Sequence, residues 1–163
     1  MNIFNIRSLD QIEAVAKLGA EIWEDHYTPI IGKEQVSYML DKFQSVHAVQ
    51  TQIESENYHY FGLEESGLVG YLAVQKRAEA MFLSKFYIHK SERGKGFAKL
   101  ALKFVEDFAL KNECTEISLT VNKYNSGSIK AYEKMGFKSV DEVVADIGQG
   151  YVMDDYIMKK LIK

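Results

Sequence analysis

Hydrophobic positions in the first third of the chain recur with the spacing of α-helices. A short alternating stretch at Ile3–Arg7 predicts a first strand, and Ser8 or Asp10 is a candidate cap for the helix that follows. Apolar residues then return every three or four positions up to Trp23, and Thr28–Gly32 should end this helix. The predicted helices of this part cover residues 12–23, 33–43 and, as a shorter segment, 47–55.

Alternation replaces helical spacing after residue 57, which favours a sheet. Ser66-Gly67 joins two alternating runs in the manner of a hairpin, and Gly148-Gln149-Gly150 does the same near the end of the chain. The predicted strands cover residues 58–65, 68–77, 80–89, 115–121, 137–144 and 151–162, and the predicted helices cover 97–108 and 126–135. A three-strand meander, a βαβ segment and a final hairpin predict an α/β (α+β) fold, with a mixed sheet and helices on its faces.

Composition adds few constraints to this picture. The 163 residues include one proline and no low-complexity segment, which predicts a single domain over residues 1–163. A net charge of −3 gives no basic footprint for nucleic acid, and the single cysteine, Cys114, excludes a disulfide framework. No run of apolar residues is long enough for a membrane span, so we expect a cytoplasmic protein without a membrane partner.

The turn after Ile88 carries the first candidate chemistry. The sequence HKSERGKGF places Arg93, Gly94, Lys95 and Gly96 between a strand and a helix. The first N–H groups of a helix have no internal partner, and glycines let an oxyanion approach them, so this turn predicts a phosphate site. The spacing fits neither the P-loop nor the dinucleotide fingerprint. An ordinary glycine-containing turn with exposed cations is the alternative.

A second segment lies one strand later, in NKYNSGSIKAYEKMGF. Together the two segments resemble the GNAT superfamily of acetyl-CoA-dependent N-acetyltransferases. Residues 93–98 match its Arg/Gln-x-x-Gly-x-Gly/Ala motif, with Gly96 and Ala98 at the small positions. The later pattern Asn-x-x-small-x-x-x-Tyr-x-x-x-Gly-Phe is matched by Asn125, Ser128, Tyr132, Gly136 and Phe137.

This resemblance implies the GNAT acyl-CoA N-acyltransferase fold, a mostly antiparallel sheet whose strands 82–89 and 115–121 splay apart. It also implies that acetyl-CoA is the cofactor and that it lies in this gap. Backbone near Tyr87, Ile88 and His89 would bind the pantetheine arm. The N–H groups of residues 93–98 would hold the pyrophosphate, and Asn125, Ser128 and Lys134 are candidates for outer contacts. These cofactor-binding candidates are Tyr87, Ile88, His89, Arg93, Gly94, Lys95, Gly96, Phe97, Ala98, Asn125, Ser128 and Lys134; no metal site is expected.

The implied reaction is direct transfer of an acetyl group to an amine that has lost a proton. A backbone N–H near Ile88 would polarise the acetyl carbonyl, and Tyr132, the catalytic candidate, would protonate the departing sulfur. Tyr132 could instead be a core residue. The general base is open. Some members of the family place a glutamate on the central strand, whereas the inward-facing options here are Ser84, a poor base, and Lys85. Other candidates for the base are Glu79, Glu24, Asp25, His26 and a chain of water molecules.

The acceptor is predicted to be a small-molecule amine. Trp23 and Tyr27 share a helix face beside Glu24 and Asp25, and rings with carboxylates suit a cation, although these residues could equally be core and solvated surface. The ending GQGYVMDDYIMKKLI is similar to the last hairpin of the bacterial PaiA-type polyamine acetyltransferases. Amino-acid derivatives, protein N-termini, a non-catalytic acyl-CoA-binding module and an unrelated phosphate-binding protein remain alternatives. Edge strands could pair two chains into a homodimer.

Overall fold

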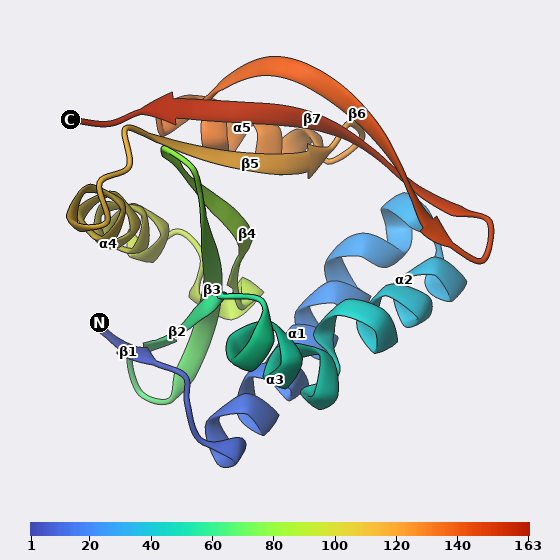
Figure 1. Ribbon diagram of the computed structural model, residues 1–163. Helices are drawn as coiled ribbons and strands as arrows, with labels where there is room; N and C mark the ends of the chain where they lie inside the picture. Colours follow the sequence, from blue (N-terminus) through green and yellow to red (C-terminus); the bar gives the residue numbers. More distant parts are fainter. The chain divides into compact units, whose positions relative to one another are not determined.

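The computed structural model describes residues 1–163, whose helices and strands are drawn in Figure 1. These residues form two compact units. Unit 1 contains residues 1–75 and 84–104, and unit 2 contains residues 76–83 and 105–163. Strands β3 and β4 and helix α4 each contribute residues to both units. No helix combines the length and apolar character that a membrane span requires.

The order of elements follows the predicted sequence of helices and strands. The helices are α1 (Leu9–Ile31), α2 (Lys33–Met39), the π-helix η1 (Leu40–Gln44), α3 (Val46–Ser55), the short 3₁₀ helix η2 (Lys90–Glu92), α4 (Phe97–Lys111) and α5 (Ser126–Lys134). The strands are β1 (Asn2–Asn5), β2 (His59–Glu64), β3 (Leu68–Arg77), β4 (Ala80–Ile88), β5 (Glu116–Asn122), β6 (Lys138–Gly148) and β7 (Tyr151–Leu161).

These strands form a seven-stranded mixed sheet in the order β1-β2-β3-β4-β5-β7-β6. Within unit 2, Ala80–Phe82 of β4 pairs in parallel with Glu116–Ser118 of β5, while β5 with β7 and β6 with β7 are antiparallel. The predicted α/β (α+β) class with a mixed sheet is therefore confirmed. The splay of β4 from β5 stays a prediction, because β4 from Ser84 onwards belongs to unit 1 and β5 to unit 2.

Helix α1 begins as predicted and ends later than predicted. The Ser8 hydroxyl accepts from the Gln11 N–H, and the Gln11 side chain accepts from the Ser8 N–H, which completes a capping box. The helix continues through Pro29 to Ile31, so the predicted break over 28–32 is wrong except at its last residue. Gly32, at φ +87°, makes the break, since such a φ is strained for residues with a Cβ.

The predicted helix over 33–43 changes its pitch at Leu40. Residues Leu40–Gln44 form a π-helix, which leads into α3 through Ser45, and the Ser45 hydroxyl accepts from the Ala48 N–H. A π-helix widens the turn and changes which side chains and carbonyls a helix presents. Here it buries the Gln44 side chain and turns the Phe43 carbonyl towards Lys85 of β4.

Helices cover both faces of the sheet in unit 1, as two adjacent β2 residues show. Tyr60 stacks on Tyr71 and hydrogen-bonds to Gln52 of α3, whereas the Phe61 ring meets the Phe104 ring of α4 at 4.8 Å. Successive strand residues point to opposite faces, so α3 and α4 lie on opposite sides. On α4, Leu102 is buried, whereas Leu100 is 55% exposed.

In unit 2, a short turn over residues 123–125 joins β5 to α5. The buried Asn125 caps this helix as predicted, with its side-chain oxygen accepting from the Ser128 N–H, and Gly136 follows the helix at φ +98°. The β5 face that carries Ile117, Leu119 and Val121 is buried. The predicted last hairpin is confirmed, and its turn residues 148–150 all have positive φ.

Candidate active site

The glycine turn between β4 and α4 has the backbone of an anion cradle. Gly94 and Gly96 have φ angles of +79° and +84°, a region that is strained for other residues. A Cβ built on either glycine meets no atom within 4 Å, so both positions border open space. Helix α4 begins at Phe97, and the first N–H groups of a helix have no partner within it. This turn therefore combines backbone N–H donors with open space in which an anion can bind.

The two cations of the turn are held differently. The Arg93 Nε donates to the Ile88 carbonyl over 3.1 Å, which fixes the side chain. The two terminal guanidinium nitrogens take no part in this bond. Lys95 Nζ lies 2.7 Å from a Glu92 carboxylate oxygen, three residues earlier in the chain. Arg93 therefore adds the larger uncompensated positive charge, and Lys95 is partly neutralised by Glu92.

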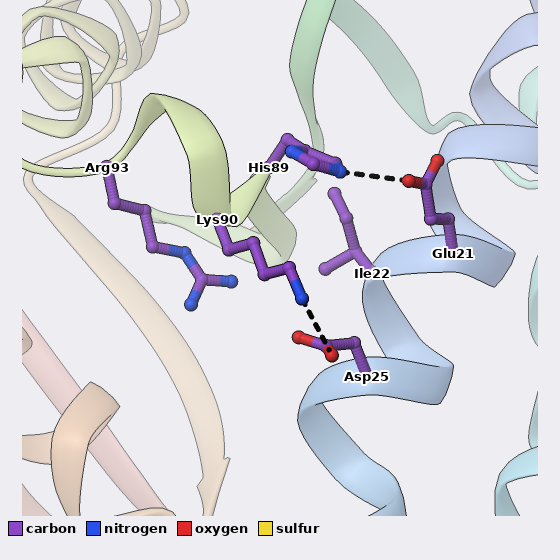
Figure 2. A pocket seen from close by; sticks show the side chains of 6 residues that line it. All are labelled: Glu21, Ile22, Asp25, His89, Lys90 and Arg93. Atoms are coloured by element: carbon purple, nitrogen blue, oxygen red, sulfur yellow. Dashed lines mark hydrogen bonds and ion pairs between the residues drawn. The ribbon is translucent and has the colours of Figure 1, made fainter.

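A pocket of about 110 Å³ lies between this turn and α1 in unit 1 (Figure 2). Its lining residues are Glu21, Ile22 and Asp25 of α1 with His89, Lys90 and Arg93 of the turn. His89 Nε2 lies 2.9 Å from Glu21, and Lys90 Nζ lies 3.2 Å from Asp25. Asp25, a candidate base and acceptor residue, is thus an exposed ion-pair partner of the turn.

The end of β4 approaches β3 unusually closely because residue 70 is a glycine. A Cβ on Gly70 would lie 2.5 Å from the Tyr87 carbonyl oxygen and 3.2 Å from the Ile88 Cα. The His89 N–H donates to the Val69 carbonyl, and the His89 carbonyl accepts from the Glu92 N–H. The N–H and the carbonyl of His89 are therefore both hydrogen-bonded within the protein. Gly70, which sequence analysis missed, determines how closely β3 approaches Tyr87 and Ile88, the residues predicted to bind pantetheine.

Trp23 and Tyr27 share a face of α1, as predicted, but they differ in how accessible they are to an acceptor. Trp23 is only 4% exposed and packs its ring 5.6 Å from the Tyr87 ring. The Tyr27 hydroxyl is half-buried and lies 3.0 Å from the Tyr87 hydroxyl. Trp23 is thus a core residue, and the interpretation of it as acceptor wall is not supported. Glu24 is exposed.

Lys85 is a buried cation that sequence analysis weighed only as an inward-facing position. Its Nζ donates to the Phe43 carbonyl over 2.7 Å, to Gln52 Oε1 over 3.2 Å and to the Tyr60 hydroxyl. Burial lowers the pKa of Lys85 to about 7, and burial raises the pKa of Tyr60 well above its ordinary value. These three bonds join β4 to η1, α3 and β2, which is a structural role.

The later motif lies in unit 2. Asn125 caps α5, Ser128 and Tyr132 are half-buried, and Lys134 is exposed near the end of the helix. The Tyr132 ring packs edge-on against Phe137 at 5.5 Å, and the Phe137 N–H donates to the Tyr132 carbonyl. The pattern Tyr-x-x-x-Gly-Phe thus closes the helix through Gly136 and orients Tyr132.

Of the remaining base candidates, Glu79 lies exposed in the β3–β4 turn of unit 2, where its carbonyl accepts from the Thr115 N–H. His26 packs against Tyr27, and Ser84 is half-buried on β4.

Sequence analysis missed one further carboxylate. Asp155 of β7 is 4% exposed, and its Oδ1 has no hydrogen-bond donor. No cluster of three or more His, Cys, Asp or Glu residues could hold a metal ion.

Comparison with known proteins places these features in a family. The chain is 30% identical over 99 residues to an uncharacterised N-acetyltransferase, YycN, of Bacillus subtilis, a match that covers 57% of this chain and 64% of that protein, less than two thirds of its length. A PaiA N-acetyltransferase from Thermoplasma acidophilum, solved in complex with coenzyme A, has a similar structure, with a TM-score of 0.81 and 23% identity over 99% of each chain.

A ribosomal-protein-alanine N-acetyltransferase from Brucella melitensis shares the fold, with a TM-score of 0.73 and 17% identity over 99% of this chain and 100% of that one. At these identities the two structures support the fold. The family model described as the acetyltransferase (GNAT) family matches residues 19–137, which include the glycine turn and the Asn125–Phe137 segment. The chain therefore belongs to the GNAT acetyltransferase family.

Proposed function

We propose that this protein is an acetyl-CoA-dependent N-acetyltransferase that transfers an acetyl group directly to a primary amine. The observation that carries the proposal is the glycine turn, where two positive-φ glycines border open space at the start of α4. Acetyl-CoA is the cofactor of the family, and the coenzyme A complex of the Thermoplasma relative agrees with it. Its thioester supplies the activated acetyl group.

In this proposal the chain's own residues divide the work. The N–H groups of residues 93–98 bind the pyrophosphate, assisted by Arg93, and the backbone at Tyr87 and Ile88 binds the pantetheine arm. Asn125, Ser128 and Lys134 contribute outer contacts. Tyr132 donates a proton to the departing sulfur, and its packing on Phe137 restricts the directions in which its hydroxyl can point.

A polyamine is the acceptor class that we propose to test first. Two considerations support it: the sequence resembles the PaiA branch at its last hairpin, and the structure resembles a PaiA enzyme. The net charge of −3 also suits a cationic acceptor. The structural likeness to a ribosomal-protein-alanine acetyltransferase makes protein N-termini the second class to include.

The test is release of free thiol from acetyl-CoA with a panel that contains spermidine, spermine, amino acids and N-terminal peptides. We expect release with one amine class and none without an amine. Binding of coenzyme A without release for any amine would contradict the enzymatic proposal and favour a non-catalytic acyl-CoA-binding protein. Binding of ATP or NAD in place of coenzyme A would contradict the cofactor assignment.

Two substitutions test the residue roles. Gly96→Trp should abolish coenzyme A binding, because the indole would fill the open space at the turn. Gly67→Trp is the matched control, since Gly67 also has positive φ and no atom within 4 Å of a Cβ, so backbone strain is common to both variants. Tyr132→Phe retains the ring contact with Phe137 and should lower kcat by about 10²-fold without changing coenzyme A affinity. An unchanged kcat would mean that Tyr132 is structural.

A further inference from the structure

Asp155 is a buried carboxylate for which the fold of unit 2 provides no partner. It is 4% exposed, its Oδ1 receives no hydrogen bond, and its Cα partners are Asn122 of β5 and Val143 of β6, neither of which carries a charge. Its neighbour Asp154 provides the contrast, since Asp154 lies 2.9 Å from Lys123 Nζ. Buried carboxylates without a partner are costly, so this position calls for an explanation.

The position of Asp155 in the sheet connects it with the predicted cofactor site. Paired residues of antiparallel strands project from the same face, so Asp155 shares a face with Asn122 and, along β5, with Thr120 and Ser118. Those β5 side chains are polar and at least partly accessible. The opposite face carries the buried Leu119 and Val121 together with the contact between Lys160 and Glu106 of α4.

Asp155 also lies opposite the last residue of β5. The Asn122 side chain accepts from the Tyr124 N–H, and the Asn122 carbonyl accepts from the Asn125 N–H, so this residue begins the turn into α5. That turn carries the Asn125 and Ser128 positions assigned to cofactor binding. Asp155 therefore lies one strand away from this turn, on the face of unit 2 opposite the buried Leu119 and Val121.

We infer that Asp155 is the general base of the reaction, the carboxylate that receives the ammonium group of the acceptor and removes its proton. This inference rests on the proposed acetyltransferase function. In the step, an N–H bond of the ammonium breaks and an O–H bond forms on Asp155. The freed lone pair forms the C–N bond while the C–S bond breaks, and Tyr132 gives its proton to the sulfur. The nitrogen then loses its second N–H proton to the Tyr132 oxygen, which leaves the amide and a neutral tyrosine. The Asp155 proton then leaves to solvent.

The electrostatics of Asp155 suit this role. Burial, and secondarily the charge of Asp154, raise the pKa of Asp155 to about 6, which places it near the operating pH that an efficient base requires. The charged groups next in the chain to the two strand partners of Asp155 are Lys123, beside Asn122, and Glu142, beside Val143, and these two bond to each other at 3.2 Å. The remaining charged residues of β5 and β6 are Glu116, Lys138, Asp141 and Asp146. The base should therefore be active above about pH 6 and inactive below it.

The experiment compares Asp155→Asn with Asp155→Glu and with the matched control Asp154→Asn, using the best amine found for the wild type. We expect Asp155→Asn to lower kcat by about 10²-fold or more, to abolish the rise of kcat with pH near 6, and to leave coenzyme A affinity unchanged. Asp155→Glu should restore part of the activity. Asp154→Asn should keep kcat within about threefold of the wild-type value. It should also move the rise of kcat to lower pH, because the charge of Asp154 contributes to the raised pKa of Asp155.

Three results would overturn the inference. They are a wild-type profile without a rise near pH 6, an Asp155→Asn enzyme with wild-type kcat, and an Asp155→Asn enzyme of low activity that still shows the rise. The first of these is measured on the wild type and needs no variant to fold. Failure of the proposed function is a separate outcome, since it would appear as a wild-type protein that acetylates no amine.

Discussion

Gly70 provides the sharpest test of how the structure shapes the cofactor strand. Gly70→Ala places a Cβ 2.5 Å from the Tyr87 carbonyl oxygen, and that oxygen belongs to backbone rather than to a flexible side chain. Reaching even 3.0 Å requires that β3 and β4 separate by about 0.5 Å at this point. Overpacking of this kind costs about 1–3 kcal/mol, which corresponds to a Tm lower by about 2–12 °C in a chain of this size.

The displaced backbone is the segment proposed to bind pantetheine, so the substitution should act on ligand binding as well as on folding. We expect the Kd for coenzyme A, measured by isothermal titration calorimetry well below the Tm of the variant, to rise about tenfold, which is about 1.4 kcal/mol. A change of that size is reasonable for hydrogen-bonding groups moved by half an ångström.

Gly62→Ala is the matched control for this experiment. Its Cβ would lie 2.6 Å from the Phe4 ring, so it also overpacks a strand of unit 1, but β2 carries none of the proposed cofactor contacts. We expect a loss of Tm that is no larger, because the Phe4 ring can shift more easily than backbone, and an unchanged Kd for coenzyme A. If Gly70→Ala destabilises the protein while its Kd equals that of Gly62→Ala, the assignment of Tyr87 and Ile88 to the cofactor site is refuted.

Three further predictions concern stability. Asp155 has a folded-state pKa of about 6 against an ordinary 3.8, so wild type should lose about 2 kcal/mol relative to Asp155→Asn between pH 4 and pH 7 in urea unfolding; parallel curves would contradict this. Lys85 has a pKa lowered from 10.5 to about 7, so wild type should gain about 2 kcal/mol relative to Lys85→Met between pH 7 and pH 9, and equal slopes would contradict burial of the charge. Because Lys90 and Asp25 are exposed, Asp25→Asn should change the unfolding free energy by less than about 1 kcal/mol, and a larger change would show that the pair anchors the turn.

Local features of the sequence determined most of the elements and the cofactor motif. Ser8 and Asn125 were predictable caps because a short polar side chain can satisfy helix N–H groups only at that position. The conformation of Gly94 and Gly96 follows likewise from the absence of a Cβ, and the family pattern of residues 93–98 and 125–137 lies within continuous segments. Such signals involve neighbours in the chain and are therefore visible in the sequence.

Tertiary structure decided the features that depend on residues far apart in the chain. The continuation of α1 through Pro29 and the π-helix at Leu40–Gln44 contradict local propensity, and packing against the sheet can override a weak local preference. The Lys85 bonds to Phe43 and Gln52, the approach of β4 to Gly70, and the burial of Asp155 beside its accessible β5 neighbours are equally invisible in the sequence. Each of these features depends on the backbone groups that the fold places beside a side chain and on how far the fold shields that side chain from solvent. Burial and neighbouring groups together set the pKa of the titratable residues.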